Sequence, residues 1–407
     1  MRRGSNLPAV GTYNQTLVLD LIRRSPDGIS RIELAARTGL SAQTLSNVSR
    51  RLVAEGWVRE GAPVVAGPGK PRTPLQLEPS ARYAVGIHLD PAVDTIVLVD
   101  LAGEVVAHAD RPPRQGGSSA QVVRDLGDAV DALLDGAGVD RSRVLGIGVA
   151  APGPLDADRG VLFAPPLLDP AWHDVALASL LHARTGLATT VEKDVVAAML
   201  GELWTDADQE LDDAIFVYYG AGVGAGLAVD GTPLRGRTGN AGDIAHLVVE
   251  PDGPRCACGQ HGCLGVAIAP ERLLTDAGVL ARGAAPLAPE LRRHLGELAQ
   301  RAAGGDASAS ATIERAAAHL AAAVVQMNNL LDADVVIVGG PLWSIVQDAA
   351  APALARAVAA SDATATVRGT KMLASSRGTD VAAVGAACLV LDAALTARPT
   401  DLMISAR

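Results

Sequence analysis

The chain has 407 residues, of which 49% are hydrophobic and 20% charged, and its formal net charge at pH 7 is −10. This length exceeds one ordinary core, so we expect two or three domains, and an aromatic share of only 2% predicts aliphatic cores. No apolar run follows Arg2 and Arg3, which argues against a signal peptide, and no stretch approaches the length of a membrane span. We therefore expect a cytoplasmic protein that contacts no membrane, with cysteines that are reduced or metal-bound.

The charge is unevenly distributed along the chain. Residues 1–80 contain 11 Lys and Arg against 6 Asp and Glu, a net of +5, which leaves −15 for the remainder. A basic module on an acidic body is typical of a nucleic-acid-binding domain joined to a domain that phosphate repels. Chance unevenness of surface charge would give the same numbers. The sequence pattern of residues 1–80 is therefore needed to distinguish a nucleic-acid-binding domain from chance.

The first residues carry the helix signals of a helix-turn-helix. An amphipathic stripe from Tyr13 predicts a first helix, and the Ser-Arg-Ile-Glu motif from Ser30 has the spacing of a capping box, which predicts a short second helix. Gly39 ends that helix, and Ser41 is predicted to cap a third one that runs to about Glu55. A short helix, a glycine turn and a longer helix are the order expected of this motif.

The outward-facing residues of the third helix are hydrogen-bonding side chains, whereas an ordinary exposed helix face is rich in Glu and Lys. Gln and Asn can bond to adenine edges, and Arg can reach guanine or phosphate. Strand-like pieces at 57–60 and 73–77 follow, joined by a Gly-Pro-Gly-Lys-Pro-Arg tip that predicts a wing beside the phosphates; a solvated β-turn is the alternative for that tip. The DNA-binding candidates are Gln43, Thr44, Ser46, Asn47, Arg50 and Arg51 on the helix and Lys70 and Arg72 on the wing.

From Tyr83 onward the chain alternates apolar strand-like runs with Ala-rich helical segments, which is typical of an α/β fold. Residues 282–311 lack a strand pattern and are expected to be helical with loops. The clearest strands are predicted at 84–90, 95–101, 144–150, 214–220 and 335–340, and helices at 119–134, 194–204 and 312–331.

A cluster of sulfur and imidazole side chains predicts a metal site. Three of the four cysteines, Cys256, Cys258 and Cys263, lie within eight residues, a short loop after His246. Three thiolates and one imidazole can complete a tetrahedral Zn²⁺ shell, and a shell filled by protein ligands indicates a structural zinc. Reduced thiols in a loop are the alternative, which the density of cysteines disfavours. Cys388 lies in an Ala-rich apolar segment and is expected to pack in a core.

With these features in place, the chain resembles the ROK family (repressors, open reading frames and kinases) over nearly its whole length. The resemblance implies a two-lobed actin-like fold with the ligand in the cleft between the lobes. Family members with a winged helix are sugar-responsive repressors, and members without one are usually sugar kinases. The motifs that carry it are PGPLDADRG from Pro152, WHDV from Trp172, EKDVVAAMLGE from Glu192, YYGAGVGAGLAVDG from Tyr218, GNAGDIAH from Gly239, CACGQHGCL from Cys256 and VVIVGG from Val335.

The expected fold class is therefore α/β, with an N-terminal winged helix-turn-helix followed by a two-lobed actin-like (ribonuclease H-like) ATPase/sugar-kinase fold that holds a structural zinc site. We expect the winged helix at 1–80 and a first lobe at 81–205, completed by a C-terminal helix at about 381–400. The second lobe, with the zinc site, is expected at 206–380.

An ATP-dependent sugar kinase is the alternative function. Asp194 matches the aspartate that takes a proton from the sugar hydroxyl in family kinases. Those kinases open with Asp-x-Gly-Gly-Thr, whereas His88–Ala92 reads His-Leu-Asp-Pro-Ala, so side chains and a proline ring replace the glycines that let backbone approach phosphate. The glycine-rich run at 220–226 remains but lacks the hydroxyl residue that kinases commonly place there. We therefore expect no enzyme activity and a ligand-binding role for Asp194.

The resemblance also implies the sugar contacts. Related sites present Glu-Asn-Asp, Gly-Glu-Ile-Gly-His and Cys-Leu-Glu, where this chain has Glu-Lys-Asp, Gly-Asp-Ile-Ala-His and Cys-Leu-Gly. The cleft is thus less negative and roomier, so glucose should bind poorly, and a modified, acidic or oligomeric sugar is our hypothesis. The ligand-binding candidates are Lys193, Asp194, Asn240, Asp243 and His246.

The role of Lys193 stays open between two alternatives. It can pair with a ligand carboxylate or phosphate, or it can form a salt bridge to Glu192 or Asp194 or face solvent. His246 is expected to keep one ring nitrogen toward the cleft while zinc holds the other. The expected partners are operator DNA with an inverted repeat, the sugar effector and a second copy of the chain, with a tetramer as the alternative assembly.

Overall fold

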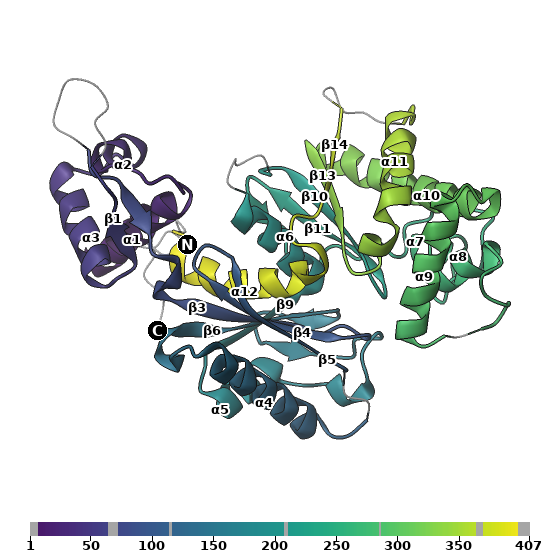
Figure 1. Ribbon diagram of the computed structural model, residues 1–407, viewed down its shortest axis with the longest axis horizontal. Helices are drawn as coiled ribbons and strands as arrows, with labels where there is room; N and C mark the ends of the chain where they lie inside the picture. The colour runs from purple at the N-terminus through teal and green to yellow at the C-terminus, as the bar shows by residue number, and fades with distance from the viewer. Residues whose placement is uncertain are drawn as a thin grey trace.

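The computed structural model describes residues 7–63, 72–113, 116–206, 211–284, 286–363 and 369–397. A small N-terminal module of helices and two short strands lies beside a larger body built on two sheets (Figure 1). Each sheet of the body has five strands, and helices cover the outer face of each sheet and fill the space between them.

The module has the three helices and the short hairpin of a winged helix. The predicted capping box is confirmed, because the Ser30 side chain accepts from the Glu33 N–H and the Glu33 carboxylate accepts from the Ser30 N–H. The predicted cap at Ser41 is confirmed as well, whereas the first helix begins well before Tyr13. The elements are α1 (Leu7–Arg23), α2 (Arg31–Thr38), α3 (Ala42–Ala54) and the antiparallel strands β1 (Val58–Glu60) and β2 (Leu75–Leu77).

The first lobe is a mixed sheet with the strand order β5-β4-β3-β6-β9. Its first three strands form an antiparallel meander, and β6 and β9 continue the sheet parallel to β3. Two helices, α4 (Ser119–Ala137) and α5 (Leu177–Thr185), cover the outer face (Figure 1). The strands are β3 (Tyr83–His88), β4 (Asp94–Asp100), β5 (Val105–Arg111), β6 (Val144–Ala151) and β9 (Thr189–Lys193), with a separate small hairpin of β7 (Leu155–Asp156) and β8 (Val161–Leu162).

The second lobe has the strand order β12-β11-β10-β13-β14. Alternate residues of β10 and β13 pack outward against α10 and α11 in one aliphatic core. The strands are β10 (Ala214–Tyr219), β11 (Val223–Val229), β12 (Thr232–Pro233), β13 (Val335–Gly339) and β14 (Lys371–Ala374), and the helices are α7 (Leu264–Ala267), α8 (Pro270–Asp276), α9 (Ala288–Ala303), α10 (Ala307–Leu331) and α11 (Trp343–Ala359).

Some strands of the body are absent from the predicted set, and one of them corrects the reading of a motif. The run 220–226 is expected to be one glycine-rich loop, but only Gly220–Gly222 forms the turn, with the Gly220 N–H donating to Gly222 O at 2.9 Å. From Val223 the chain is strand β11, paired antiparallel with β10. Glycine has a low intrinsic β propensity, so only the pairing partner makes this segment a strand.

Two apolar helices, α6 (Asp194–Thr205) and the Ala-rich α12 (Val381–Leu395), lie between the sheets and contact each other along their length (Figure 1). A Cβ at Gly385 of α12 would lie 1.8 Å from the carbonyl oxygen of Ala197, and one at Gly148 of β6 would lie 1.7 Å from that of Ala386. Only glycine permits these backbone approaches. The two central helices can therefore seat against each other and against the first sheet.

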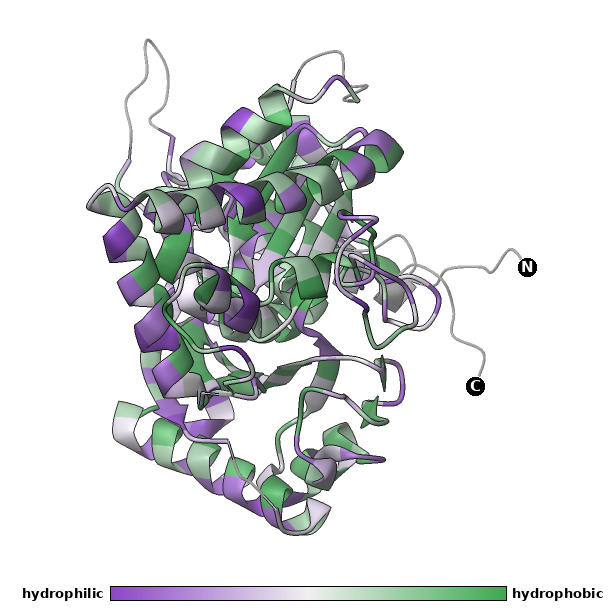
Figure 2. Cartoon of the chain, turned by 90° about the vertical axis from the view of Figure 1, so that its right-hand side faces the viewer, coloured by the Kyte–Doolittle hydropathy of each residue, from purple (hydrophilic) through white to green (hydrophobic). Residues whose placement is uncertain are grey.

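The expectation that no stretch approaches the length of a membrane span is wrong by length and composition alone, because within the described residues one segment, Gly378–Leu395, is long and apolar enough. Most of it is α12, and 61% of the window is buried inside the protein. Figure 2 shows the same arrangement, with hydrophobic residues concentrated on the strands and inner helices and hydrophilic ones on the outer helices. The hydrophobicity of α12 thus serves the core between the lobes.

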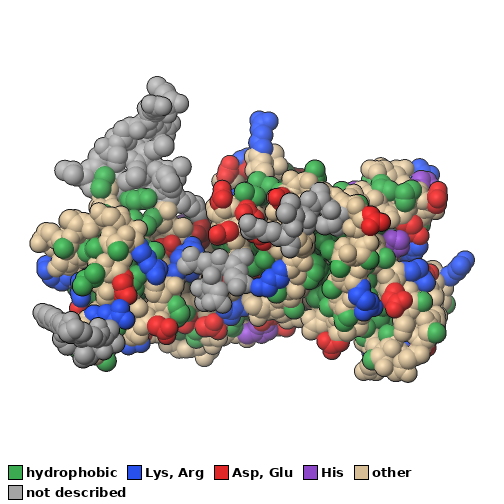
Figure 3. All heavy atoms as spheres, turned by 90° about the horizontal axis from the view of Figure 1, so that it is seen from above, with side chains coloured by type: hydrophobic (Ala, Val, Ile, Leu, Met, Phe, Trp, Pro, Cys, Tyr) green, Lys and Arg blue, Asp and Glu red, His purple; other side chains and the backbone are tan. Residues whose placement is uncertain are grey.

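Besides the packing of α1 against α12, Arg23 at the end of α1 joins the module to the body. Its guanidinium donates to the carbonyl oxygen of Trp204 at 3.0 Å and to Asp20 at 2.9 Å, and its central carbon lies 3.8 Å from the centroid of the Trp204 ring. The Arg23 side chain is only 6% exposed, and a buried cation held by a carboxylate, a carbonyl and an aromatic face is geometrically constrained. Seen from above, Lys and Arg side chains are visible on the module at the left end and also along the body, with Asp and Glu side chains among them (Figure 3).

We expect Gly385→Ala to lower the free energy of unfolding by about 1–3 kcal/mol, because the new methyl group would overlap the Ala197 carbonyl and force α6 and α12 apart. Gly136→Ala, in the exposed end of α4 with nothing within 4 Å of the new Cβ, is the matched control. It should raise stability by about 0.5–1 kcal/mol. Urea unfolding of both variants checks this, and equal stability of the two would contradict the packing described.

Candidate functional site

A cavity of about 550 Å³ opens between the two lobes and collects residues that are far apart in the sequence. Its walls come from the segments after β3 and β6, the start of α6, the β10–β11 turn and the loop around residues 240–246. The volume lies within the range of small-molecule sites. All five ligand-binding candidates line it, namely Lys193, Asp194, Asn240, Asp243 and His246.

Asp194 is the first residue of α6 and faces this cavity. Its carboxylate accepts a hydrogen bond from the Val195 N–H at 2.7 Å. Burial raises the pKa of Asp194 above its ordinary value, and the nearby His88 and Lys193 oppose that shift. A hydroxyl that donates to this carboxylate would replace the water that burial removes, so the position suits a polyhydroxyl ligand.

Lys193 does not form the salt bridge that was one alternative for it. The Glu192 carboxylate pairs with Arg235 instead, while the Lys193 ammonium donates to the backbone carbonyl of Asn240 at 3.1 Å. The side chain is buried, with 8% of the residue exposed. Among the described residues no carboxylate lies within ion-pair distance of it, although the Asp194 carboxylate is close enough to interact with it electrostatically. The hydrogen bond of this buried ammonium thus goes to a neutral carbonyl.

The Asn240 side chain forms hydrogen bonds within the protein, and its expected role as a ligand contact stays a prediction. Its amide nitrogen donates to Leu155 O at 2.7 Å, and its amide oxygen accepts from the Leu155 N–H at 3.0 Å. Both ends of the amide thus hold the chain after β6 in place. Asn240 shapes the wall of the cavity, while the exposed carboxylate of Asp243 faces it without a comparable clamp.

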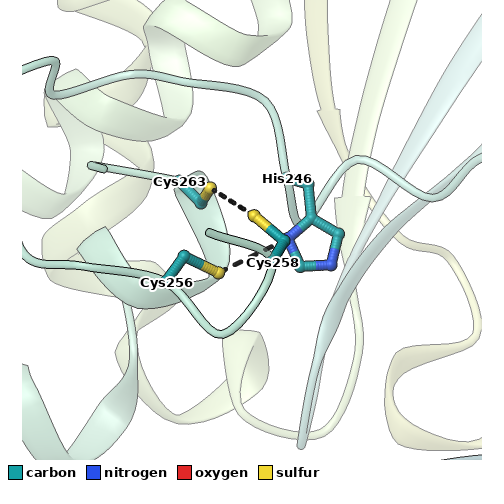
Figure 4. A group of neighbouring side chains, drawn as sticks. All are labelled: His246, Cys256, Cys258 and Cys263. Carbon is teal, nitrogen blue, oxygen red and sulfur yellow. Dashed lines mark hydrogen bonds between the residues drawn. The ribbon is translucent and has the colours of Figure 1, made fainter. Parts of the chain in front are cut away.

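The predicted metal ligands come together in space. The ligand atoms of His246, Cys256, Cys258 and Cys263 all lie within 4.8 Å of one another, and Figure 4 shows the four side chains converging. The distance between Cys256 Sγ and His246 Nδ1 is 3.5 Å, and that between Cys258 Sγ and Cys263 Sγ is 3.6 Å. Neighbouring atoms of a tetrahedral shell with metal–ligand bonds of about 2.0–2.3 Å lie about 3.5–3.8 Å apart. The cluster therefore has the size of a metal site.

Glycine shapes the loop that carries the thiols. Gly262 has φ +63°, and a Cβ there would lie 1.5 Å from the Glu250 carbonyl oxygen. Both the backbone conformation and the lack of space therefore exclude a side chain at this position. The neighbouring Cys263 immediately precedes the short helix α7. Because His246 both faces the thiols through Nδ1 and lines the cavity, the cluster is joined directly to the ligand site.

The segment His88–Ala92 lies where two cavities meet. His88 ends β3 and its ring packs edge-to-face on that of Tyr218, with centroids 6.0 Å apart. Tyr218 lines the first cavity, His88 lines a second one of about 380 Å³ together with Arg292, and Asp90 lines both. Sequence reasoning missed Asp90 and Tyr218 as cavity residues; the only signal was their position beside the altered loop and the glycine turn.

The recognition candidates occupy the outer face of α3. Gln43, Asn47 and Arg50 are exposed and contact only other side chains of that helix, with Gln43 donating to Asn47 and Arg50 to Ser46. Arg51 is paired with Glu55 at 2.7 Å and Thr44 shares the N-cap with Ser41. On the wing, Arg72 pairs with Glu33 at 2.8 Å, and Lys70 lies outside the described residues. The DNA contacts themselves stay predictions.

Comparison with known proteins places both parts of the chain. The family model described as "ROK family" matches residues 86–393, and that described as "MarR family" matches residues 12–65. A glucokinase of Halalkalibacterium halodurans is 29% identical over 269 residues, which cover 64% of this chain and 81% of the relative. A xylose repressor of Bacillus subtilis is 30% identical over 258 residues, which cover 62% of this chain and 65% of the relative, just under two thirds of its length.

A solved structure resembles the whole arrangement of module and body. It is titled as the crystal structure of a ROK family transcriptional regulator, homologous to the MLC protein of E. coli, and it superimposes with a TM-score of 0.77. The match covers 95% of this chain and 98% of that one at 23% sequence identity, a likeness that establishes the fold: a winged helix on a two-lobed sugar-kinase-like body. Since the ROK family model spans most of the chain, the protein belongs to the ROK family.

Proposed function

We propose that the protein is a sugar-responsive transcriptional repressor, in which the winged helix binds operator DNA and the cavity between the lobes binds a sugar or sugar derivative. The repressor named among its relatives, the match of the module to the MarR family and the polar cavity support this. The main observation in favour of a response to ligand is the position of α6. One end of this helix lies in the cavity, and the other end contacts the winged-helix module.

Helix α6 begins at Asp194 in the cavity and reaches Trp204 in its last turn. Trp204 is buried and receives the Arg23 guanidinium of the module on its ring and its carbonyl oxygen. A ligand that moves the Asp194 end therefore moves a rigid element whose other end holds α1. Such a contact gives the two sites a coupling free energy without any direct contact between sugar and DNA.

The module is proposed to bind an inverted repeat as part of a cytoplasmic homodimer, with a tetramer as the alternative assembly. Gln43, Asn47 and Arg50 face base edges, since exposed bonds within one helix are easily exchanged for bonds to bases. Arg51 and Thr44 start from contacts within the protein, so their contribution is proposed to be smaller. We keep the domain division of 1–80, 81–205 with 381–400, and 206–380.

Phosphoryl transfer is the second candidate, favoured by the related glucokinase and by Asp194. Catalysis would require the sugar hydroxyl and the terminal phosphate to meet in one space. The His88–Tyr218 pair stands between the two cavities, and carboxylates of Asp90 and Asp194 face that point. His88 and Pro91 stand where family kinases place an acid and a glycine that lets backbone approach phosphate, so we propose that the chain is not an enzyme.

The effector is proposed to be a modified, acidic or oligomeric sugar. The buried Lys193 ammonium has only a carbonyl as partner, and an anionic substituent of the ligand would satisfy it. Asp243 and the free ring nitrogen of His246 offer an acceptor and a second polar contact nearby.

The metal is proposed to be zinc, with His246, Cys256, Cys258 and Cys263 as its four ligands. Three sulfurs and one nitrogen are the donor set that zinc takes in closed structural sites. When bound, the ion would hold the loop and fix the His246 ring beside the cavity. The four protein ligands leave no position for a catalytic water, so its role is stability.

For DNA binding, Arg50→Ala should weaken binding to the gene's own upstream duplex by at least about tenfold, because it removes a base or phosphate contact. If Arg50 touches phosphate, the salt slope should also fall by about one. The control is Arg159→Ala, which removes the same charge from an exposed turn of the body. Fluorescence anisotropy at several salt concentrations measures both, and parent-like binding of Arg50→Ala would remove α3 from the interface.

For the response, one sugar of a panel of glucose, xylose, N-acetylglucosamine, cellobiose and glucuronate should bind by calorimetry and change DNA affinity by about 5–150-fold. Arg23→Met should keep sugar affinity within about twofold but reduce that change, because it breaks the contact with Trp204. A full response in Arg23→Met would contradict coupling through α6.

The same panel tests the effector class and the absence of catalysis. Lys193→Asn should weaken the binding of glucuronate by about tenfold and leave the affinity for neutral sugars nearly unchanged, since only the anion pairs with the ammonium. Tight glucose binding that Lys193→Asn leaves intact would rule out an acidic effector. Incubation with ATP should release no ADP, and sugar phosphorylation abolished by Asp194→Asn would establish the kinase.

For the metal, protein purified without added zinc should contain about one zinc per chain, and Cys263→Ser should lose most of it together with thermal stability. Cys388→Ala, a buried thiol of α12 far from the cluster in sequence, should keep its zinc. Mass spectrometry and thermal unfolding measure both, and a metal-free parent of unchanged Tm would refute the site.

A further inference from the structure

Tyr218 has a buried hydroxyl group to which the sections above give no role. It is 4% exposed, lies next to the end of β10 and lines the cavity between the lobes. Its Oη has no hydrogen-bond partner among the described residues. A buried polar atom left unpaired costs about 1–3 kcal/mol, so its presence at a cavity wall calls for a partner that arrives from the cavity.

The ring of Tyr218 packs between His88 and the turn at Gly220. One edge contact is made with His88, at an interplanar angle of 83°. Gly220 lies over the ring, and a Cβ there would be 2.6 Å from Tyr218 Cε1. Absence of a side chain at Gly220 is therefore what makes room for the ring beside the turn.

The next residue on the same strand, Tyr219, has a hydroxyl that forms a hydrogen bond within the protein. Tyr219 points to the opposite face of β10, and its hydroxyl donates to the Ile268 carbonyl oxygen at 2.8 Å. Successive side chains of a strand alternate between faces, so Tyr219 serves the core of the second lobe while Tyr218 serves the cavity.

The charges around Tyr218 define the chemistry of its partner. Burial, Asp90 and Asp194 keep the pKa of Tyr218 well above its ordinary value, with Arg292 as the opposing cation. The phenol is thus a neutral donor and acceptor beside two carboxylates. A phosphate at this point would be repelled by both carboxylates, whereas a neutral hydroxyl can accept from Tyr218 and donate to Asp194.

We propose that Tyr218 is an effector-binding residue that forms, with Asp194, a subsite for a neutral hydroxyl of the sugar in the cavity between the lobes. The inference rests on the proposed function, since it assigns one contact of the same ligand. It divides the cavity chemically, with a neutral hydroxyl at Tyr218 and any anionic substituent at Lys193.

The test uses the full chain and whichever sugar of the panel above binds it most tightly. Tyr218→Phe removes only the hydroxyl, and its Kd for that sugar should rise about tenfold or more, as expected for a site built to bond a ligand hydroxyl. Tyr219→Phe is the matched control, with unchanged Kd and a lower Tm because it loses a buried hydrogen bond.

Monodeoxy analogues of the same sugar identify the contacted hydroxyl and remove any doubt about folding. One analogue should bind the parent about tenfold more weakly than the full sugar does. In Tyr218→Phe the same analogue should lose clearly less affinity, because only the hydrogen bond to Asp194 is then left to lose. Parent-like affinity of Tyr218→Phe, or additive losses for every analogue, would overturn this inference and leave the proposed function standing. A parent that binds no sugar of the panel would overturn the proposed function and this contact with it.

Discussion

The close crossing of α6 and α12 is the constraint on which the rest of the molecule depends. Gly385 brings the backbone of α12 against Ala197 of α6, and Gly148 brings α12 down onto the first sheet. These two helices separate the lobes, so their spacing sets the width of the cleft and the position of Asp194 within it.

This packing also explains why three distant parts of the chain act at one place. Val195, directly after Asp194, lies against the glycines of β11, since a Cβ at Gly226 would be 2.2 Å from the Val195 carbonyl oxygen. The β10–β11 turn and Tyr218 are thereby held beside the start of α6. The other end of the helix carries Trp204 to the module, so one rigid element connects the cavity with α1.

The electrostatics of the cleft follow from which charges are paired within the protein. Arg235 neutralises Glu192, and this leaves the neighbouring Lys193 ammonium without a carboxylate among the described residues. At the opposite end, burial keeps the pKa of Asp194 raised beside the neutral Tyr218 hydroxyl. These charges are the basis of the proposed effector, a sugar with an anionic or strongly polar end and a neutral hydroxyl end.

Local signals in the sequence determined the winged helix, the main strands of both lobes and the assembly of His246 with three thiols. Caps such as Ser30 and Ser41 act on backbone groups three residues away, and the spacing of Cys256, Cys258 and Cys263 fits a single loop, so neighbours in the chain suffice to specify them. The identification of Asp194 and Asn240 as cavity residues came from family resemblance rather than from local physics.

Only the tertiary structure decided the features that depend on partners far away in the chain. Strand β11 exists because β10 pairs with it, although its glycines indicate a loop. Lys193 lacks a carboxylate because Arg235, forty residues on, takes Glu192, and the Asn240 amide is occupied by Leu155. Tyr218 faces the cavity because of its register in β10, and Arg23 meets Trp204 only after the module has docked. Each of these outcomes is set by long-range packing, in which the identity of a neighbour in space cannot be read from the neighbours in sequence.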